Sequence, residues 1–74
     1  MNTIIVLSGV KVNDSTVHAF ANDNAYVSFV MDNLDVIARR LNAPMFDVLD
    51  ILDTDAATAK GVTVNRIPLQ GYLV

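Results

Sequence analysis

The chain of 74 residues contains no cysteine, no tryptophan and no glutamate. Without cysteine it has no disulfide, no thiolate nucleophile and no cysteine-ligated zinc or iron–sulfur site. This absence fits a reducing compartment, and we expect a cytoplasmic protein. Because there is no glutamate, all eight carboxylate side chains are aspartates, which favour helix caps and turns over helix interiors. Any helix must therefore be held mainly by the packing of its apolar face.

Long hydrophobic runs are also missing. The longest, residues 4–7, is followed at once by Ser8 and Gly9. It is far shorter than the roughly 20 residues that cross a bilayer as a helix, and no basic segment precedes it as in a secretory signal. We therefore expect no membrane partner.

The sequence lacks the usual signatures of catalysis and cofactor binding. It has no glycine-rich phosphate loop and no HExxH motif, and His18 is its only histidine. A general base needs an orienting partner and a cleft, and a chain of this size has little volume for a pocket. We expect a protein that is not an enzyme and that binds no cofactor.

Positive charge is scarce, because five Lys and Arg stand against eight Asp and give a net charge of -3. Nucleic acid and anionic membranes both select basic surfaces. The charge balance argues against either as the default partner and favours another protein.

Apolar residues, in contrast, are abundant. They make up 53% of the chain, against roughly 45 to 50% in typical domains. The length fits a single domain over residues 1–74. A domain this small buries only roughly 60% of its unfolded surface, so some apolar side chains should remain exposed. We infer a homodimer, a larger protein partner, or both.

The N-terminal third has the pattern of a β-hairpin. Residues 3–12 are rich in β-branched side chains, residues 16–21 alternate between apolar and polar, and Asn13-Asp14-Ser15 lies between them. Asn and Asp tolerate the positive φ angles of tight turns. A helix starting at Ser15 is the alternative, but Asn22-Asp23-Asn24 would then lie inside it. The hairpin is preferred.

Helical periodicity follows. Asn22 or Asp23 can cap a helix that runs to about Leu41, and Pro44 suits the first turn of a second helix. A further helical turn is expected over residues 53–60, ended by Gly61, and a closing strand over residues 62–67. The fold predicted is α+β: an N-terminal β-hairpin, two antiparallel helices packed on one sheet face, and a C-terminal strand. The first helix has an apolar stripe of Val27, Val30, Leu34, Ile37 and Leu41, and the second has one of Met45, Val48, Leu49 and Leu52.

Two helices joined at Asn42-Ala43-Pro44 also raise the alternative of a helix-turn-helix regulator that binds nucleic acid. A recognition helix meets phosphates and base edges through Arg, Lys, Asn and Gln. The second helix offers Asp47 and Asp50 instead, and the basic pair Arg39-Arg40 ends the preceding helix, where cations complement the helix dipole. The charges argue against this alternative.

The aspartates at positions 47, 50, 53 and 55 lack the glycine and glutamate spacing of an EF-hand, so no metal site is predicted. An acidic face that docks on a basic protein surface is the simpler hypothesis. We therefore expect a non-catalytic protein-protein interaction module, a small acidic adaptor or inhibitor of the kind that phages and other mobile elements encode. Tyr72 belongs either to a core strand or to an apolar tail that joins a partner's sheet. The predicted partner-binding residues are Met45, Phe46, Asp47, Asp50, Asp53, Phe29 and Tyr72.

Overall fold

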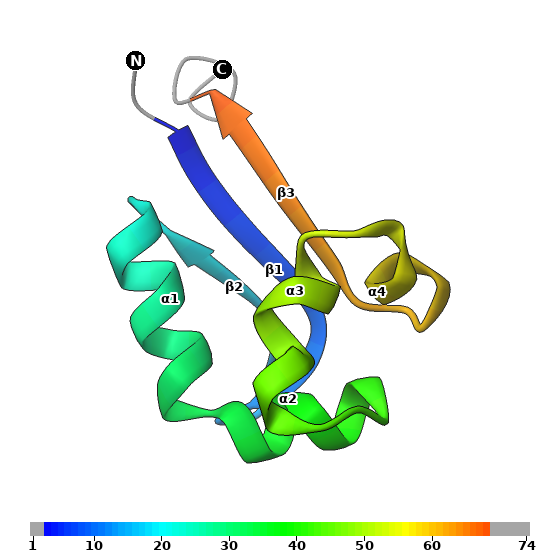
Figure 1. The fold of residues 1–74 in the computed structure, drawn as a ribbon. Helices are drawn as coiled ribbons and strands as arrows, with labels where there is room; N and C mark the ends of the chain where they lie inside the picture. The colour runs from blue at the N-terminus through cyan, green and yellow to red at the C-terminus, as the bar shows by residue number, and fades with distance from the viewer. Residues whose placement is uncertain (1–2, 69–74) are drawn as a thin grey trace.

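The computed structural model describes residues 3–68 and contains a three-stranded antiparallel sheet in the order β2-β1-β3. The helices lie on one side of this sheet (Figure 1). The predicted α+β fold, with a hairpin first, helices next and a strand last, is confirmed. The elements are β1 (Thr3–Val12), β2 (Ser15–Phe20), α1 (Asp23–Asp32), α2 (Leu34–Leu41), the 3-10 helix η1 (Met45–Asp47), α3 (Val48–Leu52), α4 (Asp55–Ala59) and β3 (Thr63–Pro68).

The hairpin turn is the expected two-residue turn. Asn13 and Asp14 have φ angles of 52° and 66°, and Val12 pairs with Ser15 across it. Two consecutive positive φ angles are typical of the hairpin turns whose twist matches that of the strands. The alternative helix from Ser15 does not form.

A bulge in β1 keeps the whole strand in contact with the core. The register of β1 against β2 shifts between Ser8 and Val12, and Gly9 within this segment has a φ of 94°. The extra residue changes the alternation, because Ile5 and Leu7 are buried before it and Val10 and Val12 after it. A side chain at position 9 would also strike the carbonyl oxygen of Gly61, so glycine is required there.

The predicted single helix from Asn22 to Leu41 is wrong, because the chain breaks at Asn33 into α1 and α2. Asn33 has φ −125° and ψ 27°, and its side-chain amide donates a 2.8 Å hydrogen bond to the carbonyl oxygen of Phe29. Such local bonds compete with helix propagation. The apolar stripe is interrupted as well: Val27 is 40% exposed, and Tyr26 is buried in its place.

The predicted second helix is shorter than expected. Pro44 is extended and precedes the single 3-10 turn of η1, after which α3 runs for only five residues. Val48 and Leu52 of the predicted stripe are buried, whereas Met45 is exposed. The further helical turn is confirmed as α4, with Thr54 as its N-cap. The buried core consists of Ile5, Leu7, Val10, Val12, Tyr26, Val30, Ile37, Ala38, Leu41, Val48, Leu52, Ala57 and Val62.

Candidate partner-binding surface

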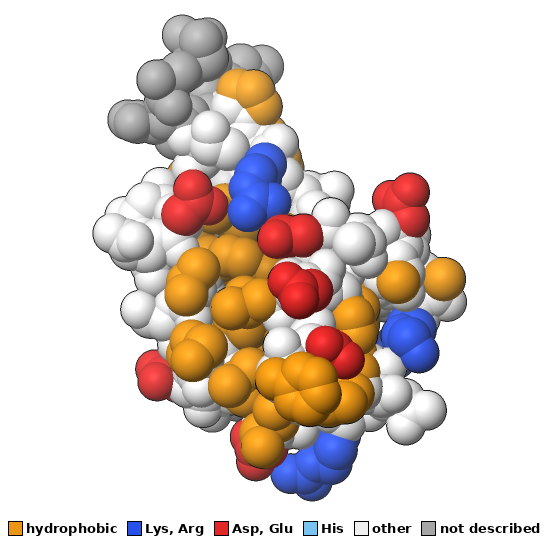
Figure 2. Space-filling view, in the orientation of Figure 1, with side chains coloured by type: hydrophobic (Ala, Val, Ile, Leu, Met, Phe, Trp, Pro, Cys, Tyr) orange, Lys and Arg blue, Asp and Glu red, His pale blue; other side chains and the backbone are white. Residues whose placement is uncertain are grey.

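A hollow of 410 Å³ opens on the outer side of the helices, and its lining is almost entirely apolar. Four elements meet there because the chain turns at Asn33 and again at Pro44. Figure 2 shows hydrophobic side chains gathered over this side of the molecule. We call the lining residues the Met–Phe patch: Met31 from α1, Leu34 from α2, Met45 and Phe46 from η1, and Leu49 from α3.

Three side chains of the patch are unusually exposed for large apolar residues. Phe46 is 83% exposed, Met45 55% and Met31 53%. Single exposed apolar residues are common, but a contiguous group around a hollow is typical of an interaction site. Leu34 and Leu49 are half-buried against the core and form the base of the group.

Acidic side chains accompany the patch. Asp47, Asp50 and Asp53 follow one another at steps of three through η1, α3 and its C-cap. Within residues 3–68 these three carboxylates make no ion pair, because the ion pairs there join Asp35 to Arg39 and Asp23 to Arg66. Figure 2 shows acidic groups beside the hydrophobic surface. We call Asp47, Asp50 and Asp53 the acidic border.

One residue predicted from the sequence, Phe29, is not part of this surface. Phe29 is half-buried in an aromatic cluster, with ring centroids 5.1 Å from Phe20 and 4.8 Å from His18. Tyr72 lies outside the described residues. The structure brings Met45 and Phe46 together with Met31, Leu34 and Leu49, which are not in the predicted set. For Met31 the sequence holds a signal, because it falls outside the narrow apolar stripe of the first predicted helix and widens that helix's apolar surface to where a partner could touch.

The histidine has a structural environment. The Nε2 atom of His18 lies 3.1 Å from the carbonyl oxygen of Val10, within hydrogen-bond distance across the hairpin. Its ring also contacts Phe29. Both contacts tie β2 to the rest of the fold.

Tyr26 carries a buried polar group. The residue is 2% exposed, and its ring packs against Phe20 with ring centroids 5.8 Å apart. Its hydroxyl has no hydrogen-bond partner among the described residues. Burial raises the pKa of the Tyr26 phenol above 10.0, and the charges of Asp53 and Asp23 raise it further, while Arg66 opposes them. The guanidinium of Arg66 lies 5.9 Å from the ring centroid.

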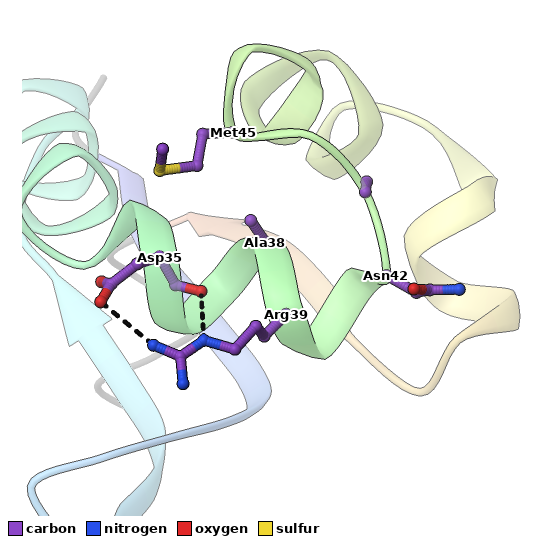
Figure 3. A pocket seen from close by; sticks show the side chains of 6 residues that line it. Asp35, Ala38, Arg39, Asn42 and Met45 are labelled. Atoms are coloured by element: carbon purple, nitrogen blue, oxygen red, sulfur yellow. Dashed lines mark hydrogen bonds and ion pairs between the residues drawn. The ribbon is translucent and has the colours of Figure 1, made fainter.

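A second, shallower hollow of 360 Å³ adjoins the patch and shares Met45 with it. Its polar wall is Arg39, which bonds both the backbone oxygen and the carboxylate of Asp35 at 3.3 Å (Figure 3). The neighbouring Arg40 donates to the carbonyl oxygen of Gly9 at 3.0 Å. Both arginines of the helix-turn-helix alternative therefore contact their own chain.

Within residues 3–68, no three acidic, histidine or cysteine side chains come close enough together to hold a metal ion. None of the helices in that part of the chain has the length and apolar character needed to span a membrane.

Comparison with known proteins gives no relative. No protein-family model, curated protein or solved structure matches the chain. Its function must be inferred from its own side chains and their arrangement.

Proposed function

We propose that the chain is a non-catalytic protein-binding module, a small acidic adaptor or inhibitor that docks on a larger protein through the Met–Phe patch. The observation that carries the proposal is the 83% exposure of Phe46 on the rim of an apolar hollow. An aromatic anchor beside flexible methionines is the composition of a binding hot spot, because such side chains gain much area at little entropic cost.

The charges define the chemistry of the partner. Asp47 and Asp50 flank the patch without an ion pair in the described part of the chain, and the whole chain carries a charge of -3. A partner that offers apolar side chains ringed by Lys or Arg would fill the hollow and neutralise the border. Complementary charges of this kind mainly raise the association rate and select the partner.

A second copy of the chain is not the expected occupant of the patch. A two-fold axis through it would set two chains of net charge -3 against each other at their acidic side, and like charges across an interface are unfavourable. The homodimer that belongs to this proposal must therefore use another surface. An inhibitor that covers a basic surface of a host protein would suit a phage or mobile element, by analogy with the size and charge of the chain.

The nucleic-acid alternative draws no support from the geometry. The helix that would enter a groove, α3, has five residues and carries Asp50 on its exposed side. Arg39 and Arg40 are engaged by Asp35 and Gly9. DNA affinity would require basic groups free to meet phosphates.

Substitutions in the Met–Phe patch and in the acidic border test the proposal. A partner captured with the wild-type chain would be purified and titrated calorimetrically with Phe46→Ala and with Asp47→Lys/Asp50→Lys. We expect Phe46→Ala to weaken binding at least about tenfold, as for a hot-spot residue, and the lysine pair to weaken it most at low salt.

Asp55→Lys is the matched control, since Asp55 is exposed at the start of α4 and does not line the hollow. It should bind with unchanged affinity. All variants should keep the wild-type circular dichroism spectrum. Wild-type affinity in both Phe46→Ala and the double variant would refute the proposed site.

A further inference from the structure

The Met–Phe patch continues along α1. Val27 lies one turn before Met31 on that helix and is 40% exposed. Residues four apart share one side of a helix, so the two side chains form a continuous apolar wall. Because Met31 of α1 and Leu49 of α3 line the same hollow, the apolar surface lies between these two helices. Figure 2 shows hydrophobic groups over α1 beside a row of acidic groups over α3. We call the Met–Phe patch together with Val27 the α1–α3 groove.

The lining of this groove determines which backbone conformation an occupant needs. Its residues are apolar and belong to α1, α2, η1 and α3, so no open sheet edge is among them. An extended segment laid there would turn backbone N–H and C=O groups toward apolar side chains that offer no hydrogen bond. A helix makes these hydrogen bonds within itself and presents only side chains. The groove therefore favours a helical occupant.

The spacing of the acidic border points the same way. Asp47, Asp50 and Asp53 recur at steps of three, which places them about 4.5 Å apart along a helix axis. A second helix alongside repeats one of its sides every three or four residues, whereas a strand repeats one side about every 6.6 Å. Over three carboxylates the strand is out of step by about 4 Å and the helix by about 1.5 Å. Lys or Arg residues on a helix would thus meet the border in register.

We infer that the α1–α3 groove binds an amphipathic helix of the partner protein. Apolar residues at steps of three and four enter the hollow, and Lys or Arg residues follow the side that faces the acidic border. The volume of 410 Å³ lies within the roughly 300 to 1,000 Å³ of pockets that enclose ligands. Arg39 lies beyond Met45 on the α2 side, so the basic side of the bound helix belongs over α3. This inference rests on the proposed function, because it names the segment of the partner that fills the Met–Phe patch.

Selection from a phage-displayed library of random 16-residue peptides tests the inference without a known partner. The full wild-type chain is the bait, and peptides that also bind Phe46→Ala are removed. We expect the remaining sequences to repeat apolar residues at steps of three and four, with Lys or Arg on one flank. Sequences that alternate apolar and polar residues, sequences with acidic flanks, or no peptide that depends on Phe46 would each overturn the inference.

The conformation of the bound peptide is tested with one selected sequence, synthesised and titrated calorimetrically against the full chain. A proline in its middle, on the side away from the anchors, should weaken binding at least about tenfold, because proline breaks a helix and leaves the anchors and charges unchanged. Alanine at the same position is the matched control and should bind as tightly as the parent peptide. Equal binding by the proline and alanine peptides would contradict a helical occupant.

A charge swap tests the contact with the acidic border. Replacing the basic residues of the peptide by glutamate should weaken binding to the wild-type chain at least about tenfold at low salt. The glutamate peptide should regain affinity for Asp47→Lys/Asp50→Lys. It should not regain affinity for Asp55→Lys, which adds positive charge away from the groove. Rescue by neither variant, or equally by both, would contradict pairing with the border.

The failures of the inference and of the proposed function are distinguishable. A captured partner that requires Phe46, together with selected peptides of strand pattern, would retain the proposed function and overturn the helix. A captured partner that binds Phe46→Ala and the double lysine variant like the wild type would refute the proposed function itself. A wild-type chain that doubles in mass with concentration, while Phe46→Ala stays monomeric, would assign the groove to a second copy and overturn the inference.

Discussion

At the scale of the residue, the hydroxyl of Tyr26 is a buried polar group that lowers the stability of the fold. It is enclosed without a hydrogen-bond partner, and an unsatisfied buried donor costs about 1 to 3 kcal/mol. The ring itself contributes core packing beside Phe20. The two effects can be separated by removing one oxygen atom.

Tyr26→Phe should therefore raise the free energy of unfolding by about 1 kcal/mol at neutral pH, because the ring stays and the unpaired hydroxyl goes. Urea denaturation measures this difference. A loss of stability instead would mean that the hydroxyl has a partner in solution.

The stabilities of the wild-type protein and Tyr26→Phe should also depend differently on pH in alkaline solution. The pKa of Tyr26 is raised above 10.0 in the folded state, so the folded chain keeps a proton that the unfolded chain releases. The contribution of this protonation difference to stability is fully present below pH 10 and is lost as the pH rises beyond it. Tyr26→Phe should lack this part of the decline, and Tyr72, common to both proteins, cancels in the comparison. Parallel curves above pH 10 would show that the phenol is not perturbed.

At the scale of the element, short polar side chains decide where helices begin and end. The side-chain oxygen of Asn22 accepts a 2.8 Å hydrogen bond from the backbone N–H of Ala25 and starts α1. Asn42 ends α2 in a left-handed conformation with φ 54°. At Asn22 the side chain supplies an acceptor for a backbone N–H that has no partner within the helix. At Asn42 the residue adopts the left-handed conformation that ends many helices.

Asn22→Ala should lower the free energy of unfolding by about 1 kcal/mol, the usual cost of a lost N-cap. Asn24→Ala makes the same chemical change on the first turn of α1, where the side chain is exposed and caps nothing. It should be neutral or slightly stabilising, since alanine favours helix. Thermal unfolding of the two variants in parallel makes the comparison, and equal losses would contradict the capping role.

Turns and helix ends that depend on a single residue type were predictable from the sequence. Features that depend on contacts between distant segments were not. The Asn13-Asp14 turn, the cap at Asn22 and the stop at Gly61 each require one residue type at one place. The break at Asn33 was missed because apolar residues recur at steps of three and four on both sides of it, so periodicity alone cannot show it. The bulge at Gly9 was missed for a similar reason: it depends on the close approach of Gly61, in the turn between α4 and β3.

At the scale of the whole molecule, some of the apolar side chains that make up 53% of the sequence lie outside the core. Composition predicts that some apolar area stays exposed, and among the described residues Val17, Val27, Met31, Met45 and Phe46 are exposed. Met45 and Phe46 were predicted from the sequence as partner-binding residues, and both line the hollow. The grouping of Met31, Leu34 and Leu49 with them could not be predicted, because the Met–Phe patch forms only once the chain has turned at Asn33 and Pro44.

The central claim is that this surplus serves another protein, and photo-crosslinking from position 46 tests it most directly. A benzophenone amino acid would replace Phe46 in cells that naturally express the chain, with the exposed Thr58 of α4 as the matched control position. We predict one discrete adduct with a larger protein from position 46, lost in the Asp47→Lys/Asp50→Lys background, and none from position 58. Crosslinks from position 46 that join only copies of this chain, or the same adducts from both positions, would contradict the claim.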